Sequence, residues 1–134
     1  MPRAVRDEVS AGGPERPGCR AILNADWIEV IDENVPDPLL AAELGAGEAA
    51  TIAAAYASGI RSVLIDDRKA RRIAVSAYKL HVHGSAGILV IAKRAGLVNA
   101  VRPLLDLMVA RGYYLSRRLV EQATAAAGET GEAG

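Results

Sequence analysis

Two neighbouring carboxylates, Asp66 and Asp67, have the type and spacing expected of a metal-binding pair. They follow the apolar run of residues 63–65, which we interpret as a buried parallel strand. Open α/β sheets place their ligand sites at the carboxyl ends of such strands, and Mg²⁺ and Mn²⁺ prefer oxygen ligands. Asp is also a favoured N-cap residue. The pair therefore predicts a metal site or a helix cap, with one of the two expected to be the cap.

Glu48 and Glu8 are two further acidic residues in positions that can hold a metal. Glu48 begins an Ala-rich helix directly after Gly45 and Gly47, and we expect these glycines to let the backbone turn sharply. A dinucleotide-binding fingerprint is excluded, because a third glycine and an immediately preceding strand are both missing. The alternative interpretations are structural. Glu48 would complement the positive end of its helix, and Glu8 would be a solvated charge on a short N-terminal helix.

A basic run directly follows the Asp pair. Arg68 shares a helix face with Arg71 and Arg72, at spacings of three and four residues, and Lys69 lies beside them. Such a face can bind a phosphate backbone. A solvated helix surface is the alternative interpretation.

The histidines and the cysteine are less informative. His81 and His83 share one face of a predicted strand, but no third zinc ligand is near them in the sequence, so a packed or surface pair is favoured. Cys19 is the only cysteine. It excludes an internal disulfide and a cysteine-based zinc site, and it fits a reducing compartment.

Short strands alternate with helices in the hydrophobic pattern, which predicts βαβ units and a parallel sheet. Gly59, Gly96 and Gly112 are expected to end helices, and Ser116 is expected to begin the last one. The predicted strands cover residues 27–31, 62–65, 80–83 and 113–115. The predicted helices cover about residues 3–9, 39–44, 48–57, 67–77, 85–95, 101–110 and 116–127, with turn-rich loops at 10–18 and 32–38.

The composition is that of one globular domain with an aliphatic core. Of 134 residues, 51% are hydrophobic, 26 are Ala and none is Phe. The 16 basic and 16 acidic residues cancel, which excludes a simple polycation that coats nucleic acid. Residues 1–48 hold 4 basic and 10 acidic residues, and the remainder holds 12 basic and 6 acidic ones. This asymmetry predicts either a metal-binding pole beside a polyanion-binding face or internal salt bridges.

The sequence has no signal-peptide core, and its longest uninterrupted apolar run, residues 88–92, is too short to span a bilayer. We therefore expect a cytoplasmic protein without a membrane partner.

Several segments, taken in order, resemble the PIN-domain family of metal-dependent ribonucleases. The similarity extends to about residue 125, and it is strongest to a subfamily described as predicted nucleic-acid-binding, VapC-like ribonucleases. The segments that carry it are residues 2–9, 44–53, 64–74, 84–89, 92–97 and 101–106.

The resemblance implies a Rossmann-like, three-layer α/β/α sandwich with a mainly parallel sheet. It would occupy residues 1–127, with a flexible tail at 128–134. Family members gather three or four acidic residues around Mg²⁺ or Mn²⁺, which activates water and stabilises charge on the phosphate being cut. Carried over to this sequence, the catalytic and metal-binding acids are Glu8, Glu48 and Asp67, with Asp66 as a further or alternative metal ligand. RNA phosphates would be bound by Arg68, Arg71 and Arg72.

The resemblance also implies a departure from the family pattern. The family begins with a strand that carries an Asp and with helices after it, whereas this sequence starts at the helix of the second acid. We therefore expect a fold without that first strand and its following helices, and weaker metal binding. An upstream start that restores the segment and a genuine truncated remnant are the two explanations.

The function implied is a Mg²⁺- or Mn²⁺-dependent endoribonuclease that cuts phosphodiester bonds, related to the toxins of toxin–antitoxin pairs. The alternative is a non-catalytic interaction module or remnant. Such a module would pair through its exposed sheet with a second copy, as a homodimer, or with an antitoxin-like protein.

Overall fold

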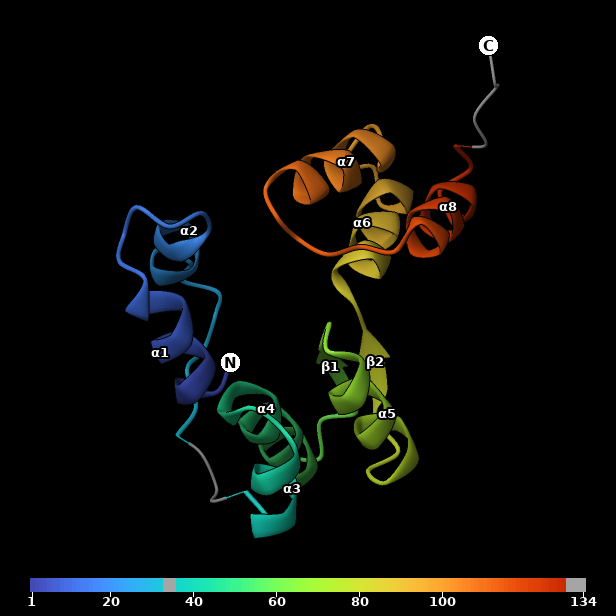
Figure 1. Cartoon of the computed structure of the whole chain (residues 1–134). Helices are drawn as coiled ribbons and strands as arrows, with labels where there is room; N and C mark the ends of the chain where they lie inside the picture. Colours follow the sequence, from blue (N-terminus) through green and yellow to red (C-terminus); the bar gives the residue numbers. More distant parts are fainter. Residues whose placement is uncertain (33–35, 130–134) are drawn as a thin grey trace. The chain divides into compact units, whose positions relative to one another are not determined.

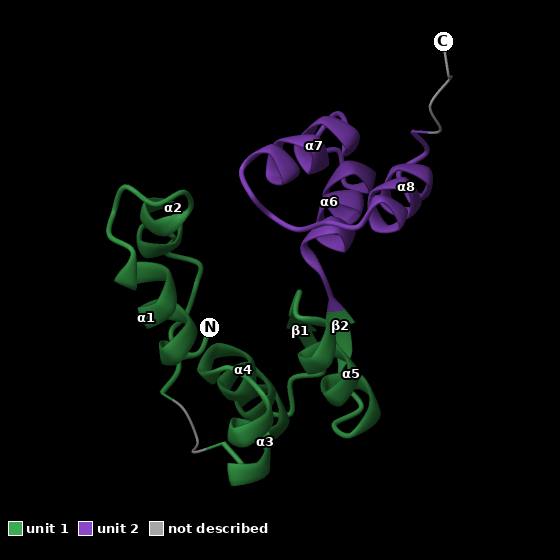
Figure 2. Cartoon of the chain, in the orientation of Figure 1, with its two compact units in different colours: residues 1–82 green, residues 83–134 purple. Residues whose placement is uncertain are grey.

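The computed structural model describes residues 1–32 and 36–129, in which helices are combined with two short strands (Figure 1). The chain divides into two compact units, unit 1 at residues 1–82 and unit 2 at residues 83–134 (Figure 2). The predicted loop residues 33–35 and tail residues 130–134 lie outside the described residues. The elements in chain order are α1 (Arg3–Ala11), α2 (Cys19–Leu23), α3 (Pro38–Glu43), α4 (Ala46–Ala57), β1 (Ser62–Leu64), α5 (Arg68–Ser76), β2 (His81–His83), α6 (Ser85–Arg94), α7 (Arg102–Ala110) and α8 (Arg117–Ala126).

β1 and β2 pair in a small parallel sheet, with α5 as the crossover between them. His81 N–H donates to the Arg61 carbonyl oxygen at 2.7 Å. Val63 and Ile65 are buried while Leu64 between them is exposed, which is the alternation of a strand with one buried face. These features confirm the predicted βαβ unit and the mixed α/β class. Within the described residues the sheet has these two strands, although four were predicted.

The strand predicted over residues 27–31 is wrong. Trp27 lies in a turn and is 81% exposed, and the segment forms a single isolated parallel bridge, between Ile31 and Pro2, beside which the Met1 ammonium group donates to the Glu29 carbonyl oxygen. Arg3 N–H donates to the Ile31 carbonyl oxygen at 3.1 Å. The pairing does not continue past Pro2, because Arg3 already begins α1. The residue types favoured a strand, but the segment makes only this one bridge.

The strand predicted over residues 113–115 is also wrong. Tyr113 N–H donates to the Met108 carbonyl oxygen at 3.0 Å and closes the last turn of α7. Gly112, with a φ of 94°, adopts the left-handed conformation that ends the helix there. Tyr114 is 91% exposed. The segment is therefore a connection to α8, and its residue types predicted a strand only because Tyr is common in strands.

The core of unit 1 is aliphatic and rich in alanine, as the composition predicts. Ile52 of α4 and the α5 residues Ala70 and Ala74 are fully buried. Small side chains at these positions let helices pack closely on the sheet. Cys19 is buried in α2 as a free thiol. The core residues are Leu40, Ala49, Ile52, Ala55, Val63, Ile65, Ala70, Ala74 and Leu80.

Unit 2 has a core formed by α6, α7 and α8. Ser116 Oγ accepts a hydrogen bond from Leu119 N–H at 3.2 Å, which confirms the predicted cap of α8. Gly96, with a φ of 74°, ends α6 as predicted, and Leu97 N–H donates to the Ala92 carbonyl oxygen at 2.9 Å. No helix in the described part of the chain is long and apolar enough to cross a bilayer. The core residues are Ala86, Val90, Val101, Leu105, Val120 and Ala123.

Glu129 closes unit 2, although the sequence places it in the tail. Gly128 has a φ of 73°, and Glu129 N–H donates to the Thr124 carbonyl oxygen at 2.9 Å, so α8 ends in a Schellman motif. This motif fixes the backbone of Glu129 at the end of α8.

The Glu129 carboxylate in turn caps α7. It accepts hydrogen bonds from Val101 N–H at 2.6 Å, from Arg102 N–H at 3.0 Å and from the Lys93 ammonium group at 2.6 Å. The bond from Lys93, followed by the two backbone bonds, lowers the pKa of Glu129 from 4.5 to about 2. A single carboxylate therefore ties together the three helices of unit 2.

Candidate functional site

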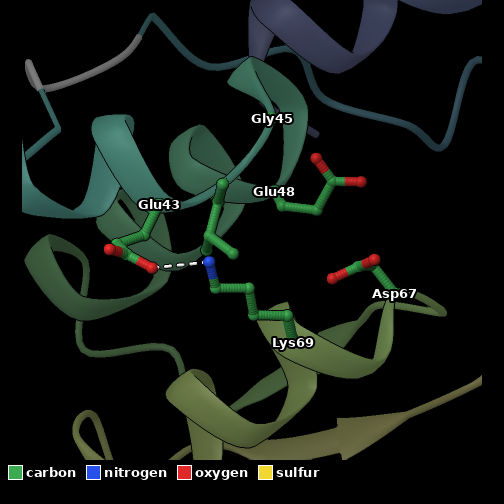
Figure 3. Close-up of a pocket in the computed structure, with 6 residues that line it drawn as sticks. Glu43, Gly45, Glu48, Asp67 and Lys69 are labelled. Atoms are coloured by element: carbon green, nitrogen blue, oxygen red, sulfur yellow. Dashed lines mark ion pairs between the residues drawn. The ribbon is translucent and has the colours of Figure 1, made fainter.

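Two cavities in unit 1 contain the acidic residues that the sequence singles out. The larger has a volume of about 300 Å³, and the smaller has a volume of about 160 Å³. Glu48 lines both. Asp67 lines the larger cavity with it (Figure 3), whereas Glu8 and Asp66 line the smaller one. The expected set of four acids is thus distributed over two cavities that share one residue.

Glu48 occupies the first turn of α4 and is partly buried. Its side chain folds back over Gly45, because a Cβ atom built there would lie 2.5 Å from Glu48 Oε2. The Ala-rich sequence favours the helix, and the helix N-terminus favours a negative charge in its first turn. Glu48 therefore stabilises the N-terminus of α4 by its charge and also lines both cavities.

Glu8 reaches α4 from the neighbouring helix α1. Its Oε1 accepts a hydrogen bond from Gly47 N–H at 3.0 Å, and its Oε2 would lie 2.7 Å from a Cβ atom built on Gly47. The N-cap of α4 is Gly45, which has no side chain to accept such a bond. Glu8 therefore caps α4 from outside the helix. Its second oxygen makes it available to the smaller cavity.

The role expected for the two glycines is wrong. Gly45 has a φ of −63° and a ψ of 159°, which most residues can adopt, and Gly47 lies within α4. Neither position needs glycine for a turn. At both positions a carboxylate, from Glu48 or Glu8, lies in the volume that a methyl group would fill, so alanine there would require that side chain to move.

Asp67 is the helix cap of the Asp pair. Its Oδ1 accepts a hydrogen bond from Ala70 N–H at 2.8 Å at the start of α5. This confirms the prediction that one of the two caps the helix. The same side chain lines the larger cavity, so capping and facing the cavity are compatible. Asp66 faces the smaller cavity instead.

Of the basic residues 68–72, only Lys69 lines one of the two cavities, although the arginines were expected to bind the substrate. Arg68 and Arg72 are exposed and Arg71 is partly buried, and neither of the two cavities has any of them in its lining. Lys69 lines the larger cavity, and its Nζ pairs with Glu43 Oε2 at 2.5 Å (Figure 3). The hydrogen bond from Lys69, and then its charge, lowers the pKa of Glu43.

Sequence reasoning missed Glu43 as a residue of the cavity. It lies at the end of α3, and only the packing of α3 against α4 brings it near α5. Lys69 had a visible signal, because it directly follows the Asp pair and Arg68 in the sequence.

The donor chemistry of the larger cavity suits a hard divalent cation. Among residues 1–32 and 36–129, no three His, Cys, Asp or Glu side chains converge to form a closed metal cage. Mg²⁺ does not need one, since it is usually bound by one or two carboxylates together with waters and substrate phosphates. Glu48 and Asp67 provide such a pair at the larger cavity.

These features define an α/β domain with a carboxylate-lined site where a parallel strand leads into a helix. A family model described as a PIN domain matches residues 1–129. The chain therefore belongs to the PIN-domain family, as the sequence motifs predicted. Searches of curated proteins and of solved structures gave no match.

Proposed function

We propose that this PIN domain is an endoribonuclease that uses Mg²⁺ or Mn²⁺. The observation that carries the proposal is the position of Glu48, which lines both cavities and has a further carboxylate beside it in each. Glu48 and Asp67 would hold the cation at the larger cavity. Glu8 and Asp66 would add negative charge from the smaller one. Membership of the family supports a nuclease-like activity.

A divalent cation bound there supplies charge neutralisation at the phosphate and activation of water. The chain's own residues position that chemistry. Glu8 holds the N-terminus of α4 and thereby the first turn that carries Glu48. Asp67 is fixed by its bond to Ala70 N–H. The exposed Arg68 and Arg72, together with Arg71, would bind phosphates of the strand outside the cavity.

The test compares two Asp residues that cap helices. Asp67→Asn removes a charge that faces the larger cavity, whereas Asp37→Asn removes the charge of the α3 cap, whose Oδ1 accepts from Leu39 N–H at 2.8 Å. Asn is as good a cap as Asp, so both variants should fold. We expect Mn²⁺-dependent cleavage of single-stranded RNA to be lost only in Asp67→Asn. Equal activity in the two variants would refute the site.

Metal binding gives a second measurement that does not depend on cleavage. Titration of the chain with Mn²⁺, followed by electron paramagnetic resonance, should show binding that Glu48→Gln abolishes. Unchanged binding in Glu48→Gln would remove Glu48 from the site. The melting temperature of each variant shows whether the fold is retained.

Protein binding is the second candidate function. Leu39 of α3 is 77% exposed and Tyr56 of α4 is 68% exposed, and a partner that packed against these two side chains would remove their apolar surface from water. The partner would be an antitoxin-like protein or a second copy of the chain, consistent with a toxin–antitoxin role. Light scattering should detect a dimer that Leu39→Glu dissociates, and a wild-type monomer would refute self-association.

A further inference from the structure

The larger cavity has an unusual charge arrangement for a site that must accept an anion. Its lining includes three carboxylates, Glu43, Glu48 and Asp67, and one cation, Lys69. A phosphodiester is negatively charged and is repelled by carboxylates. A divalent cation compensates the charge of two of them, and Lys69 is the group that can meet the phosphate itself.

The Glu43–Lys69 pair is placed against the dipoles of both helices that carry it. Lys69 lies in the first turn of α5, where a helix favours negative charge, and Glu43 is the last residue of α3, where a helix favours positive charge. Neither residue improves its own helix at that position. Their placement is explained by the ion pair that joins α3 to α5 at the cavity, and not by the stability of either helix.

The pair is accessible and contributes little to folding. The side chains of Lys69 and Glu43 are 52% and 57% exposed, and ion pairs exposed to this degree are only weakly stabilising. The ammonium group has three N–H donors. It can therefore keep its bond to the Glu43 carboxylate and still donate to an oxygen that enters the cavity. The lowered pKa of Glu43 keeps this partner charged in mildly acidic solution.

We propose that Lys69 is the substrate-binding cation of the larger cavity, where it donates to a non-bridging phosphate oxygen of the RNA strand while Glu43 holds its side chain in place. This inference rests on the proposed function, because it names the residue that binds the substrate of the same site. Among the basic residues of α5, it assigns the cavity to Lys69 and leaves the three arginines outside it.

The experiment measures binding of a fluorescently labelled single-stranded oligoribonucleotide at several salt concentrations, with Ca²⁺ in place of Mg²⁺ to suppress cleavage. Lys69→Gln should weaken binding and reduce the slope of log K against log salt by about 0.7, the value for one lost phosphate contact on a single strand. The matched control is Lys79→Gln. Lys79 is exposed and donates to the Ser76 carbonyl oxygen at the end of α5, outside both cavities, so the slope should not change.

Two further variants test the mechanism. Lys69→Arg keeps the charge and should retain most of the binding. Glu43→Gln removes the charge that holds the ammonium group in place and should weaken binding, though less than Lys69→Gln does. In cleavage assays Lys69→Gln should raise KM more than it lowers kcat, since the residue binds the substrate and does not hold the metal.

The outcomes separate this inference from the proposed function. If the wild-type chain binds RNA and Lys69→Gln matches Lys79→Gln in slope and affinity, Lys69 is not the phosphate-binding residue and the nuclease proposal stands. If the wild-type chain binds no RNA, both proposals are overturned. Unchanged or tighter binding by Glu43→Gln would overturn the holding role of Glu43.

Discussion

Glu8 in unit 1 and Glu129 in unit 2 each cap a helix to which they do not belong. Glu8 accepts one N–H from α4, at 3.0 Å, and has a second oxygen at the smaller cavity. Glu129 accepts two N–H groups at the start of α7 and the ammonium group of Lys93. The N-cap residues of both helices, Gly45 and Val101, lack a capping side-chain bond.

The two carboxylates differ in how much of their hydrogen-bonding capacity the fold uses, as expected if Glu8 belongs to the proposed site and Glu129 is structural. The Glu129 carboxylate accepts hydrogen bonds from three donors of unit 2, namely Val101 N–H, Arg102 N–H and the Lys93 ammonium group. Its side chain is only 17% exposed. Glu8 makes one bond to backbone and lies beside a cavity that two other acids also line. A carboxylate that faces a cavity and has an oxygen without a hydrogen bond can bind a ligand. A carboxylate whose oxygens are all hydrogen-bonded within the protein stabilises the fold instead.

Among substitutions that leave every acid in place, the largest expected effect comes from Gly47→Ala, which would displace the Glu8 carboxylate in unit 1. The new methyl group would lie 2.7 Å from Glu8 Oε2, so the carboxylate must move. We expect RNA cleavage to fall about hundredfold, because a displacement of about 1 Å at a reacting site can cost that much. Alanine favours a helix over glycine by about 1 kcal/mol, which offsets the lost cap, so the melting temperature should change little.

The control for this substitution is Gly87→Ala in α6 of unit 2. A Cβ atom built on Gly87 meets nothing within 4 Å. This variant should be more stable by up to about 1 kcal/mol and fully active. Equal loss of activity in the two variants would show that the space beside Gly47 is unrelated to the site.

Glu129→Gln is expected to lower the melting temperature while leaving RNA cleavage unchanged. The amide keeps one acceptor but loses the charge that attracts Lys93 and complements the N-terminus of α7. Glu121→Gln is the control, since Glu121 makes only an exposed ion pair with Arg117 four residues away. Calorimetry of both variants checks the effect. A lower melting temperature for Glu121→Gln than for Glu129→Gln would contradict it.

The same carboxylate makes a pH-dependent contribution to stability. The pKa of Glu129 is lowered from 4.5 to about 2 on folding, so its stabilising effect is complete above about pH 4.5 and is lost as the pH falls towards 2. The difference in melting temperature between wild type and Glu129→Gln should shrink over this interval. A difference that stays constant from pH 6 to pH 2 would contradict the assignment.

The smallest effect on stability is expected for two local caps, one in each unit. Asp67→Ala and Ser116→Ala each remove a side-chain acceptor from a helix N-terminus. Each should lower the free energy of unfolding by about 1 kcal/mol in urea denaturation. Only Asp67→Ala should also abolish cleavage. Loss of activity in both would mean that the Asp67 effect is one of stability alone.

Features that depend on a few adjacent residues were predictable from the sequence. The helix ends at Gly59, Gly96 and Gly112 and the caps by Asp67 and Ser116 follow from local backbone preferences. The βαβ unit and the family were predictable as well. The buried strand and its crossover helix are continuous segments of the sequence, and the order of the motifs can be compared directly with that of the family.

Features that need a distant partner were decided by the tertiary structure. Residues 27–31 and 113–115 have the composition of strands, but pairing requires another segment of matching length, and composition does not reveal whether one exists. Likewise, an alanine at position 47 would displace a carboxylate that comes from α1, which the local sequence does not reveal.

The sequence by itself thus determined which residues can cap, turn and carry charge in this protein. The tertiary structure decided which of those charges meet. It brought Glu43 to Lys69 across two helices, distributed four acids over two cavities, and bound Glu129 to the start of α7. The physical reason is that a helix cap or a helix end depends on interactions within a few residues. A cavity is formed by distant segments, and their separation along the chain does not predict their distance in space.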